Sequence, residues 1–320
     1  MKGTDIQIAV ELLLRGEVVA IPTETVYGLA ANALNEQAVA RVFEIKNRPL
    51  HNPLIVHLAN VEQVKNYTTE VPPIAVLLLR KFSPGPLTLL LPRNSLIPDI
   101  VTAGSSLVAV RIPDHTMTLE LLQRTGIPLA APSANPFGYI SPTKAEHVEK
   151  MLSGKIPYIL DGGTCDAGIE STIIGFPENV PTIYREGAIS RNRIEEFIGQ
   201  VAVFEGKKIH APGMSLVHYS PNTPLLLCSD LEQAIADHDH FNVGVITHGG
   251  YTTGLNVDDQ WLLCQGEDIE MAAHNLYAAL HDMDERGYDL IIARSFPETG
   301  LGNALNDRLS RAAMKNSNES

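Results

Sequence analysis

Short apolar runs alternate with helix-like segments along almost the whole chain, and this alternation constrains the fold more than any other feature of the sequence. The runs 54–58, 87–91 and 107–112 have the length and the composition of buried strands. Helical segments lie between such runs, for example 115–124, which is followed by the stop signal Gly126. The alternation predicts an α/β protein.

Cap signatures predict where several helices begin. A helix is expected from Asn35 to Lys46, because an Asn side chain can accept hydrogen bonds from the first free amides of a helix. Two further starts carry the capping-box pattern, in which Glu follows Ser or Thr by three residues. These are Thr143 with Glu146 and Ser229 with Glu232.

A break near residue 210 predicts two domains. The chain has 320 residues, and the stretch 210–224 holds three prolines and no periodicity. Beyond it, strand and helix patterns alternate again, which predicts a smaller, Rossmann-like parallel α/β domain. The expected organisation is a first domain at 1–209, a linker at 210–224 and a C-terminal domain at 225–320.

The charge is concentrated in the second part. Residues 1–210 hold 19 Lys and Arg against 21 Asp and Glu, whereas residues 211–320 hold 5 against 16, a net charge of −11. Stable binding of nucleic acid is therefore not expected, because like charges repel phosphates.

The sequence has no long apolar run, so no membrane span is expected. The three cysteines are far apart in the sequence, which fits a reducing cytoplasm.

Most familiar catalytic motifs are missing from the sequence. It contains no G-x-x-x-x-G-K-[ST], no G-x-S-x-G and no H-E-x-x-H. The run GLGNAL at 300–305 lacks the third glycine of a dinucleotide fingerprint and is interpreted as a helix start. His238 and His240 are interpreted as a solvated pair, with a metal site as the alternative. Cys165 is a possible nucleophile, although no activating base is identifiable.

Three stretches of the first part combine turn residues, hydroxyls and cations. Residues 22–29 follow a strand and offer threonine hydroxyls, or form only a tight turn around Gly28. Residues 46–57 place Lys46 and Arg48 at a helix end, where they can clamp phosphates or simply offset the helix dipole. Residues 131–143 form a proline-framed loop suited to binding. Its polar side chains are Ser133, Asn135 and Ser141.

Together these stretches resemble the YrdC-type threonylcarbamoyl-AMP synthase family in its longer, two-domain form. The matching pieces, in chain order, are P-T-E-T-V-Y-G-L at 22–29, K-x-R-P at 46–49, F-S-P-G-P-L-T at 82–88, V-R-I-P at 110–113, A-P-S-A-N at 131–135, D-G-G before E-S-T-I at 170–173, and P-G-M-x-x-x-H-Y-S-P at 212–221. The resemblance implies a twisted, open, mixed α/β sheet of YrdC type in the first domain.

The resemblance also implies an activity. Family members make threonylcarbamoyl-AMP and pyrophosphate from L-threonine, bicarbonate and ATP, and the product supports threonylcarbamoyladenosine modification of tRNA next to the anticodon. The implied partners are these substrates and the downstream tRNA threonylcarbamoyl transferase machinery. Mg²⁺ is expected with ATP, because negative charge develops on phosphate oxygens when pyrophosphate leaves. No protein side chain is identified as a metal ligand.

By similarity, two sets of residues are expected to bind the substrates. Arg111 suits the threonine carboxylate, and His57 can be neutral near pH 7, either as a base or as a positioning group. The catalytic candidates are Lys46, Arg48 and His57. The expected threonine set is Thr25, His57, Arg111, Ser171 and the backbone of Ala131. The expected nucleotide set is Lys46, Arg48, Asn52, Ser133, Asn135, Ser141, Arg185, the backbone of Leu107, and His218 and Tyr219 as a lid.

Two other functions compete with this one. A basic concavity of the same fold type is compatible with double-stranded RNA binding, which the acidic balance of the chain weakens. A carbamoyl-adenylate enzyme of hydrogenase maturation has a similar domain, but such chains also carry an acylphosphatase-like domain and zinc-finger cysteines, and this sequence has neither.

Overall fold

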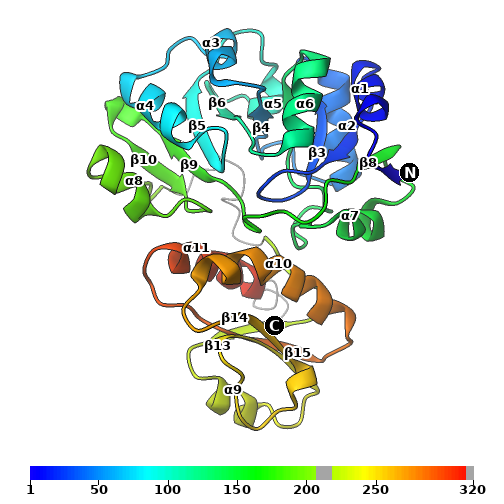
Figure 1. Ribbon diagram of the computed structural model, residues 1–320, viewed down its shortest axis with the longest axis vertical. Helices are drawn as coiled ribbons and strands as arrows, with labels where there is room; N and C mark the ends of the chain where they lie inside the picture. Colours follow the sequence, from blue (N-terminus) through cyan, green and yellow to red (C-terminus); the bar gives the residue numbers. More distant parts are fainter. Residues whose placement is uncertain (207–217, 315–320) are drawn as a thin grey trace. The chain divides into compact units, whose positions relative to one another are not determined.

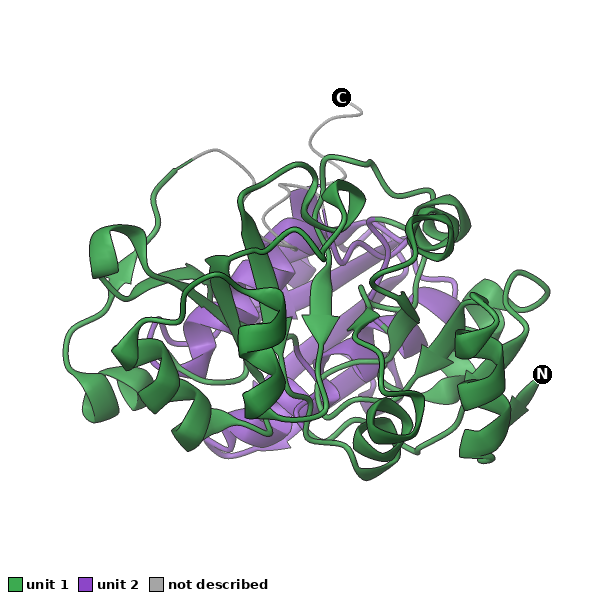
Figure 2. Cartoon of the chain, turned by 90° about the horizontal axis from the view of Figure 1, so that it is seen from above, with its two compact units in different colours: residues 1–137, 142–166, 170–215 green, residues 138–141, 167–169, 216–320 purple. Residues whose placement is uncertain are grey.

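The computed structural model describes residues 1–206 and 218–314, which form two compact units. Of the described residues, the first unit holds 1–137, 142–166 and 170–206, and the second holds the rest (Figure 2). The second unit therefore includes two short segments, 138–141 and 167–169, from the earlier part of the chain. Residues 210–217 of the expected linker lie outside the described residues.

The first unit is built on a mixed sheet that, among the described residues, has eleven strands (Figure 1). Parallel and antiparallel pairs alternate irregularly across it. In spatial order the strands are β1 (Lys2–Gly3), β8 (Tyr158–Leu160), β2 (Val19–Ile21), β3 (Gly28–Asn32), β7 (Leu129–Ala130), β4 (Ile55–His57), β6 (Leu107–Arg111), β5 (Leu87–Pro92), β9 (Thr172–Gly175), β10 (Thr182–Arg185) and β11 (Ala202–Val203). The expected mixed α/β sheet is confirmed.

Helices connect these strands at the places where the sequence carries helical periodicity. Asn35 begins its helix as expected, because its Oδ1 accepts hydrogen bonds from the amides of Gln37 and Ala38. The helices are α1 (Ile6–Leu14), α2 (Glu36–Lys46), α3 (Val64–Tyr67), α4 (Pro73–Phe82), α5 (Asp99–Thr102), α6 (Thr116–Thr125), α7 (Ala145–Leu152) and α8 (Arg191–Ile198), with 3-10 turns η1 (Val61–Gln63) and η2 (Pro177–Asn179).

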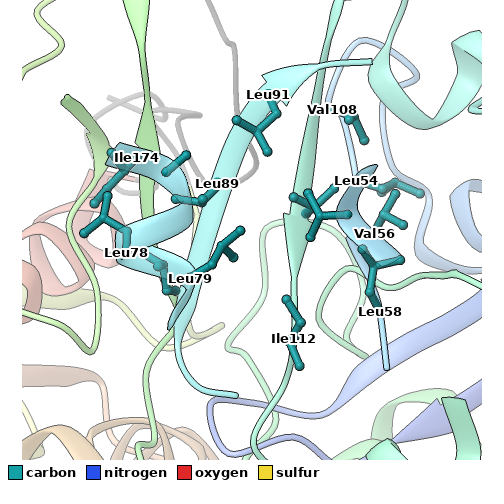
Figure 3. Close-up of a cluster of buried hydrophobic side chains, with 14 of the residues drawn as sticks. Leu54, Val56, Leu58, Leu78, Leu79, Leu89, Leu91, Val108, Ile112 and Ile174 are labelled. Carbon is teal, nitrogen blue, oxygen red and sulfur yellow. The ribbon is translucent and has the colours of Figure 1, made fainter. Parts of the chain in front are cut away.

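One face of the central strands is apolar, and the other face carries the polar groups. Because side chains alternate along a strand, Leu54 and Val56 of the β4 segment point into a core with Leu89 and Val108 (Figure 3). The intervening residues point to the opposite face. A small apolar patch covers part of that face: Ile55, Leu90, Ala109 and Ile173. The polar residues described below continue from this patch.

The second unit contains a four-stranded, all-parallel sheet, which confirms the expected Rossmann-like arrangement. Helices α10 and α11 lie together on one side of the sheet and α9 on the other (Figure 1). The strand order is β12 (Leu225–Cys228), β15 (Leu290–Arg294), β13 (Val243–Gly249) and β14 (Gln260–Gln265). The helices are α9 (Leu231–Asp237), α10 (Ile269–Glu285) and α11 (Leu301–Ala313), with the 3-10 turn η3 (Val257–Asp259).

The two expected capping boxes are wrong. Helix α7 follows Lys144, and no side chain caps it, so Thr143 does not fulfil that role. Helix α9 is capped by Asp230, whose side chain accepts from the Gln233 amide at 3.0 Å. The run at 300–305 does start a helix, with Gly300 at the N-cap of α11. Among the residues that the structure describes, no helix combines the length and the apolar character needed to cross a membrane.

Candidate active site

The matched motifs of the first unit hold one another in place. Tyr27, from the first motif, donates its hydroxyl to the Gly163 carbonyl at 2.7 Å and accepts from the Gly162 amide at 3.1 Å. The Ala134 amide in turn donates to the Tyr27 carbonyl at 2.8 Å. At Gly162 a Cβ would lie 2.6 Å from Pro22 and from the His115 ring, so only glycine fits this contact. The motifs at 22–29, 131–135 and 161–163 are therefore one packed structure.

A largely polar row crosses five neighbouring strands on the face opposite the large core. Register pairs His57 of β4 with Arg111 of β6, and Arg111 with Thr88 of β5. The row continues through Ile173 of β9 to Arg185 of β10. Cross-strand neighbours on one face lie about 5 Å apart. The sheet thus brings together residues that are up to 128 positions apart in the sequence.

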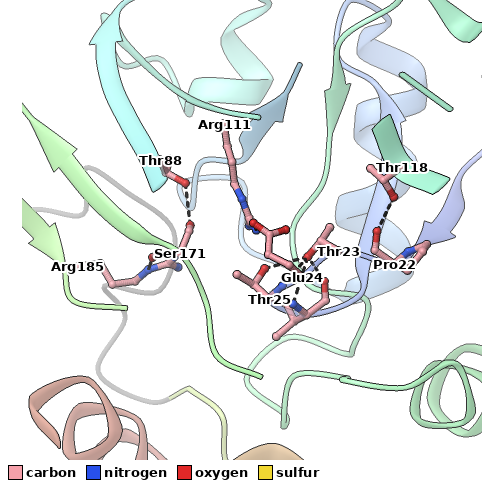
Figure 4. Close-up of polar contacts among 10 residues, drawn as sticks. Pro22, Thr23, Glu24, Thr25, Thr88, Arg111, Thr118, Ser171 and Arg185 are labelled. Carbon is pink, nitrogen blue, oxygen red and sulfur yellow. Dashed lines mark hydrogen bonds and ion pairs between the residues drawn. The ribbon is translucent and has the colours of Figure 1, made fainter. Parts of the chain in front are cut away.

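Glu24 and Arg111 form a buried ion pair at the centre of this row. The Arg111 Nη2 atom lies 2.7 Å from Glu24 Oε1, and the side chains are only 4% and 7% exposed. The pair is held by charge, because within the described residues neither side chain makes a hydrogen bond of acceptable geometry. Figure 4 shows Arg111 reaching from its strand toward Glu24 and the threonines beside it. Buried polar groups that lack hydrogen-bond partners are suited to bind a ligand that supplies those partners.

His57 lies next to Arg111 and is neutral at pH 7. Burial, and second the neighbouring Arg111 charge, lower its pKa from 6.5 to about 3. Its Nδ1 atom is buried and has no hydrogen-bond partner among the described residues. An imidazole with so low a pKa retains a proton poorly. Of the two expected roles, this favours positioning over proton abstraction.

Hydroxyl groups flank the charged pair on both sides. The Thr23 hydroxyl donates to the Val26 carbonyl at 2.6 Å, so at its 2.9 Å contact with Thr25 it is the acceptor and Thr25 donates. On the other side, the Ser171 and Thr88 hydroxyls are 2.7 Å apart. Arg185 Nη2 donates to the Ser171 carbonyl at 2.8 Å and to its hydroxyl at 3.1 Å. The hydroxyls of Thr25 and Ser171 are thereby oriented (Figure 4).

Lys46 is buried and fastens the loop that contains Ser133 and Asn135. Its ammonium donates to the Ser133 carbonyl at 2.6 Å and also to the Asn135 carbonyl. Burial, and second the nearby Arg48 charge, lower the pKa of Lys46 well below its usual range. The loop at 131–135 is therefore attached to the end of α2.

Arg48 stiffens the segment between α2 and β4. Its Nη2 donates to Asn52 Oδ1 at 2.6 Å and to the Pro53 carbonyl at 2.9 Å. Two more residues, Ala131 and Leu107, were expected to contribute only their backbones. The Ala131 amide donates to the Ile55 carbonyl at 3.0 Å, and Leu107 begins β6 opposite Pro92. The expected first-unit residues thus fall into a polar row and a neighbouring loop cluster around Lys46 and Arg48.

The remaining expected residues belong to the second unit. Tyr219 is 1% exposed, and its ring stacks on Tyr277 at 5.6 Å, with the Arg308 guanidinium 5.2 Å from its centre. The His218 ring contacts Tyr219 at 4.1 Å. The Ser141 carbonyl lies 3.2 Å from the His281 Nε2 atom. The role of His218 and Tyr219 as a nucleotide lid stays a prediction, as does the binding of the nucleotide by Ser141.

Two alternatives from the sequence lose support. Cys165 is 1% exposed, and burial raises the pKa of its thiol, so the reactive thiolate is disfavoured. His238 directs Nδ1 to the Ala234 carbonyl at 2.8 Å. Within residues 1–206 and 218–314, no group of three or more His, Cys, Asp or Glu is arranged to hold a metal ion.

Sequence reasoning missed two residues of the site, Thr88 in the row and Glu24 beside it. Both stand inside motifs that carry the family resemblance, at 22–29 and 82–88. Membership of these motifs was therefore a signal in the sequence that could have identified both residues. Pairing Arg111 with Glu24 requires knowledge of the fold, because 87 positions separate the two residues in the sequence.

The fold and the site define a class: an α/β protein of two compact units whose larger, mixed sheet carries buried charged and hydroxyl side chains on one face. Comparison with known proteins specifies the family. The family model described as "Telomere recombination" matches residues 11–187, and the family model described as "Threonylcarbamoyl-AMP synthase, C-terminal domain" matches residues 189–314. This chain belongs to the threonylcarbamoyl-AMP synthase family, as the sequence resemblance indicated.

Individual relatives agree with that assignment. "Threonylcarbamoyl-AMP synthase" of Bacillus subtilis is 42% identical over 95% of this chain and 92% of its own length. The crystal structure of P. abyssi Sua5 complexed with L-threonine is 38% identical, with a TM-score of 0.90 over 98% of this chain and 97% of that one. A shorter relative, the "Putative threonylcarbamoyl-AMP synthase" of Methanocaldococcus jannaschii, is 37% identical over 55% of this chain and 83% of its own length.

Proposed function

We propose that this chain is a nucleotidyltransferase that makes L-threonylcarbamoyl-AMP and pyrophosphate from L-threonine, bicarbonate and ATP. The product serves threonylcarbamoyladenosine modification of tRNA next to the anticodon, through a downstream tRNA threonylcarbamoyl transferase. Membership of the family and 42% identity over 95% of the chain support this activity. The single structural observation that carries the proposal is the buried Glu24–Arg111 pair in the polar row.

A zwitterionic amino acid matches this pair in charge. Its carboxylate would accept from Arg111 in a two-pronged contact, and its ammonium would donate to Glu24, so each buried charge keeps a counter-charge. The side-chain hydroxyl of threonine needs a polar partner as well. Thr25 and Ser171, one on each side of the pair, supply candidates. Neutral His57 would offer Nδ1 as a further contact without adding charge.

The reaction needs two bond-forming steps. The threonine amine first loses its proton and attacks the carbon of bicarbonate or CO₂, and water leaves when bicarbonate is the reactant. A carbamate oxygen then attacks the α-phosphorus of ATP, and the bond to pyrophosphate breaks. Negative charge grows on the phosphate oxygens in this second step, so nearby cations stabilise it. Lys46, Arg48 and Arg185 are the proposed cations.

In the structure these cations donate hydrogen bonds to protein oxygens, so they also position the segments that would bind the nucleotide. Lys46 and Arg48 fix the loop at 131–135 and the turn before β4, where Asn52, Ser133 and Asn135 would meet the nucleotide. Ser141, His218 and Tyr219 of the second unit and the backbone of Leu107 complete the proposed nucleotide set. Mg²⁺ would arrive with ATP as part of the substrate, because the described residues offer no cluster of metal ligands.

We place the reaction in the cytoplasm, where free thiols persist. Cys165, Cys228 and Cys264 are all unpaired in the structure, which fits a reducing compartment. No stable direct contact with tRNA is proposed, because the part of the chain after residue 210 is strongly acidic.

Labelled bicarbonate tests the proposal directly. The full chain is incubated with ¹⁴C-bicarbonate, Mg²⁺, ATP and one amino acid at a time, and pyrophosphate and the labelled adenylate are measured. Both are expected only with L-threonine. Pyrophosphate release without threonine, or salt-dependent RNA binding without any threonine-dependent ATP consumption, contradicts the proposal. Consumption of carbamoyl phosphate instead would indicate the hydrogenase-maturation type of reaction.

A further inference from the structure

The second unit contains a cavity of about 740 Å³ that the proposed reaction does not use. Every residue that lines it belongs to the second unit. The lining comes from the carboxyl ends of all four strands and from the starts of α10 and α11. Among these residues are Ser229, His248, Cys264, Arg294, Phe296 and Leu301. A volume of this size is typical of sites for mononucleotide-sized molecules.

The cavity lies where a parallel α/β sheet ordinarily binds ligands. From β13 the chain continues to β14 on one side, whereas from β15 it continues into α11, which contacts β12 on the other side. The connections after these two neighbouring strands leave in different directions, which creates a crevice at their carboxyl ends. His248 and Phe296 follow these two strands and meet there: their rings stack at 4.2 Å with an angle of 14°.

One side of the cavity suits an anion. Arg294, the last residue of β15, lines it, and within the described part of the chain the Arg294 guanidinium makes no hydrogen bond or ion pair. Helix α11 begins at the same wall, with Gly300 at the N-cap and no side-chain cap. The amides of its first turn and the helix dipole attract negative charge. Among the residues that line the cavity, Arg294 is the cation and Glu267 is the acid, and the Arg294 charge also helps to lower the pKa of Glu232, so the phosphate end is assigned to the Arg294 side.

The other side suits a flat, weakly polar group. The His248 and Phe296 rings stack face to face, so the pair offers a flat outer ring face, and His248 is fixed by a 3.0 Å contact of its Nε2 atom with the Ser295 carbonyl. Ile269 and Leu301 add apolar lining. A planar ring can stack on such a surface.

We propose that this cavity binds a small molecule with a phosphate at one end and a planar ring at the other, of the size of a nucleoside monophosphate. The phosphate contacts Arg294 and the first turn of α11. The ring lies against the outer face of the stacked pair of His248 and Phe296. This site is separate from the polar row of the first unit and does not depend on the activity proposed above.

Hydrogen exchange of the full-length protein locates binding within the chain. Amide exchange of peptides that cover 295–303 is followed while AMP, adenosine or pyrophosphate is titrated. AMP is expected to protect this segment, and Arg294→Gln to raise the half-maximal AMP concentration at least tenfold, because a charge-assisted contact is lost. Arg286→Gln is the matched control, since it removes an arginine that pairs with Asp282 at the end of α10. It is expected to leave protection unchanged.

Each ligand tests one part of the proposal. Adenosine is expected to protect at least tenfold more weakly than AMP, and equal protection would overturn the phosphate contact. Pyrophosphate that protects as well as AMP would overturn the ring contact. Absence of protection at 295–303 by millimolar AMP would overturn the site altogether. Threonine-dependent pyrophosphate release, measured on Arg294→Gln in parallel, is expected to remain within twofold of the unmodified chain, so failure here is distinct from failure of the proposed reaction.

Discussion

Arg111 and Glu24 lie 2.7 Å apart with almost no exposure to solvent, and their charges compensate each other inside the first unit. A buried pair of this kind is expensive to form, because both ions lose their hydration. The chain contains an ordinary pair for comparison in the same unit. Arg41 and Glu17 are 2.6 Å apart, but 46% and 32% of their side chains are exposed. The Arg111 pair is therefore better explained by ligand binding than by stability.

Removing one charge of the buried pair is expected to destabilise the first unit. Glu24→Gln leaves the Arg111 guanidinium buried without a counter-ion, which costs about 3–5 kcal/mol. Glu17→Gln, at the exposed pair with Arg41, is expected to cost less than about 1 kcal/mol. Urea unfolding of both variants measures the difference. If the two substitutions cost the same, the buried pair has no special electrostatic role.

The lowered pKa of His57 predicts how stability depends on pH. The folded-state pKa is about 3, whereas an unfolded histidine has a pKa of about 6.5. Between these values the unfolded chain binds one more proton, so this contribution is fully present above about pH 6.5 and is lost as the pH falls. The slope is up to about 1.4 kcal/mol per pH unit.

His57→Gln is expected to remove that slope. The measurement is the free energy of unfolding of the first unit between pH 4 and pH 7, relative to the unmodified chain. His51→Gln, at an exposed position of the same unit, is the control and is expected to leave the slope unchanged. An unaltered pH dependence in His57→Gln would show that this histidine is not the group that resists protonation.

Helix starts were predicted correctly where the capping side chain contacts only its own helix. They were predicted wrongly where the Glu of a capping box binds a residue from another part of the chain. Asn35 caps α2 as expected. Glu146 instead contacts Lys2 of β1 at 2.8 Å, and Glu232 accepts a hydrogen bond from Thr252 at 2.5 Å. A capping box is a local pattern, so it does not reveal partners that the fold brings in from far away.

The site could be predicted as a set of residues but not as an arrangement. The motifs at 110–113 and 170–173 led to Arg111 and Ser171, and similarity to the family added Arg185. The structure brings these three residues together around Thr88 and Ser171. It did not reveal that Arg111 faces Glu24, or that Thr88 orients Ser171. Those contacts depend on the register of β5, β6 and β9, which no local pattern specifies.

Thr88 is predicted to act as a positioning residue through Ser171. Thr88→Val removes the hydroxyl that lies 2.7 Å from the Ser171 hydroxyl and leaves the latter with only its 3.1 Å contact to Arg185. We expect the KM for threonine to rise about tenfold with a smaller change in kcat, the equivalent of about 1.4 kcal/mol of lost binding. Thr125→Val removes a buried hydroxyl that bonds the Leu121 carbonyl at 2.9 Å, far along the chain in α6. An equal rise in KM in that control would mean that Thr88 acts only on stability.

Lys46 is predicted to hold the 131–135 loop. Lys46→Met keeps the aliphatic stem but leaves the Ser133 and Asn135 carbonyls without their donor, at a cost of about 1–3 kcal/mol. The KM for ATP is expected to rise more than the KM for threonine, since the loop carries the proposed nucleotide contacts. Lys65→Met, an exposed position on α3, serves as the control. Unchanged stability and an unchanged KM for ATP in Lys46→Met would remove Lys46 from both roles.

Tyr139 is predicted to anchor the segment 138–141 within the second unit. Its hydroxyl donates to Asp284 Oδ2 at 2.6 Å, and the Thr223 amide donates to the other oxygen at 2.7 Å. Burial by itself raises the pKa of Asp284, but these hydrogen bonds outweigh it, and the net pKa lies below the ordinary value. Stability from this group is therefore present above about pH 4 and is lost as the pH falls further.

Tyr139→Phe is accordingly expected to destabilise the second unit by about 1–3 kcal/mol at pH 7, because a hydrogen bond to a charged group is lost. The difference from the unmodified chain should shrink as acid protonates Asp284, since the lost bond then involves a neutral group. Tyr251→Phe removes a hydroxyl from a side chain that is 53% exposed in the same unit, and little change is expected. Guanidinium unfolding at pH 7 and at pH 3.5 measures both variants. A Tyr139→Phe effect that is equally large at both pH values would show that the tyrosine contributes through packing rather than through the carboxylate.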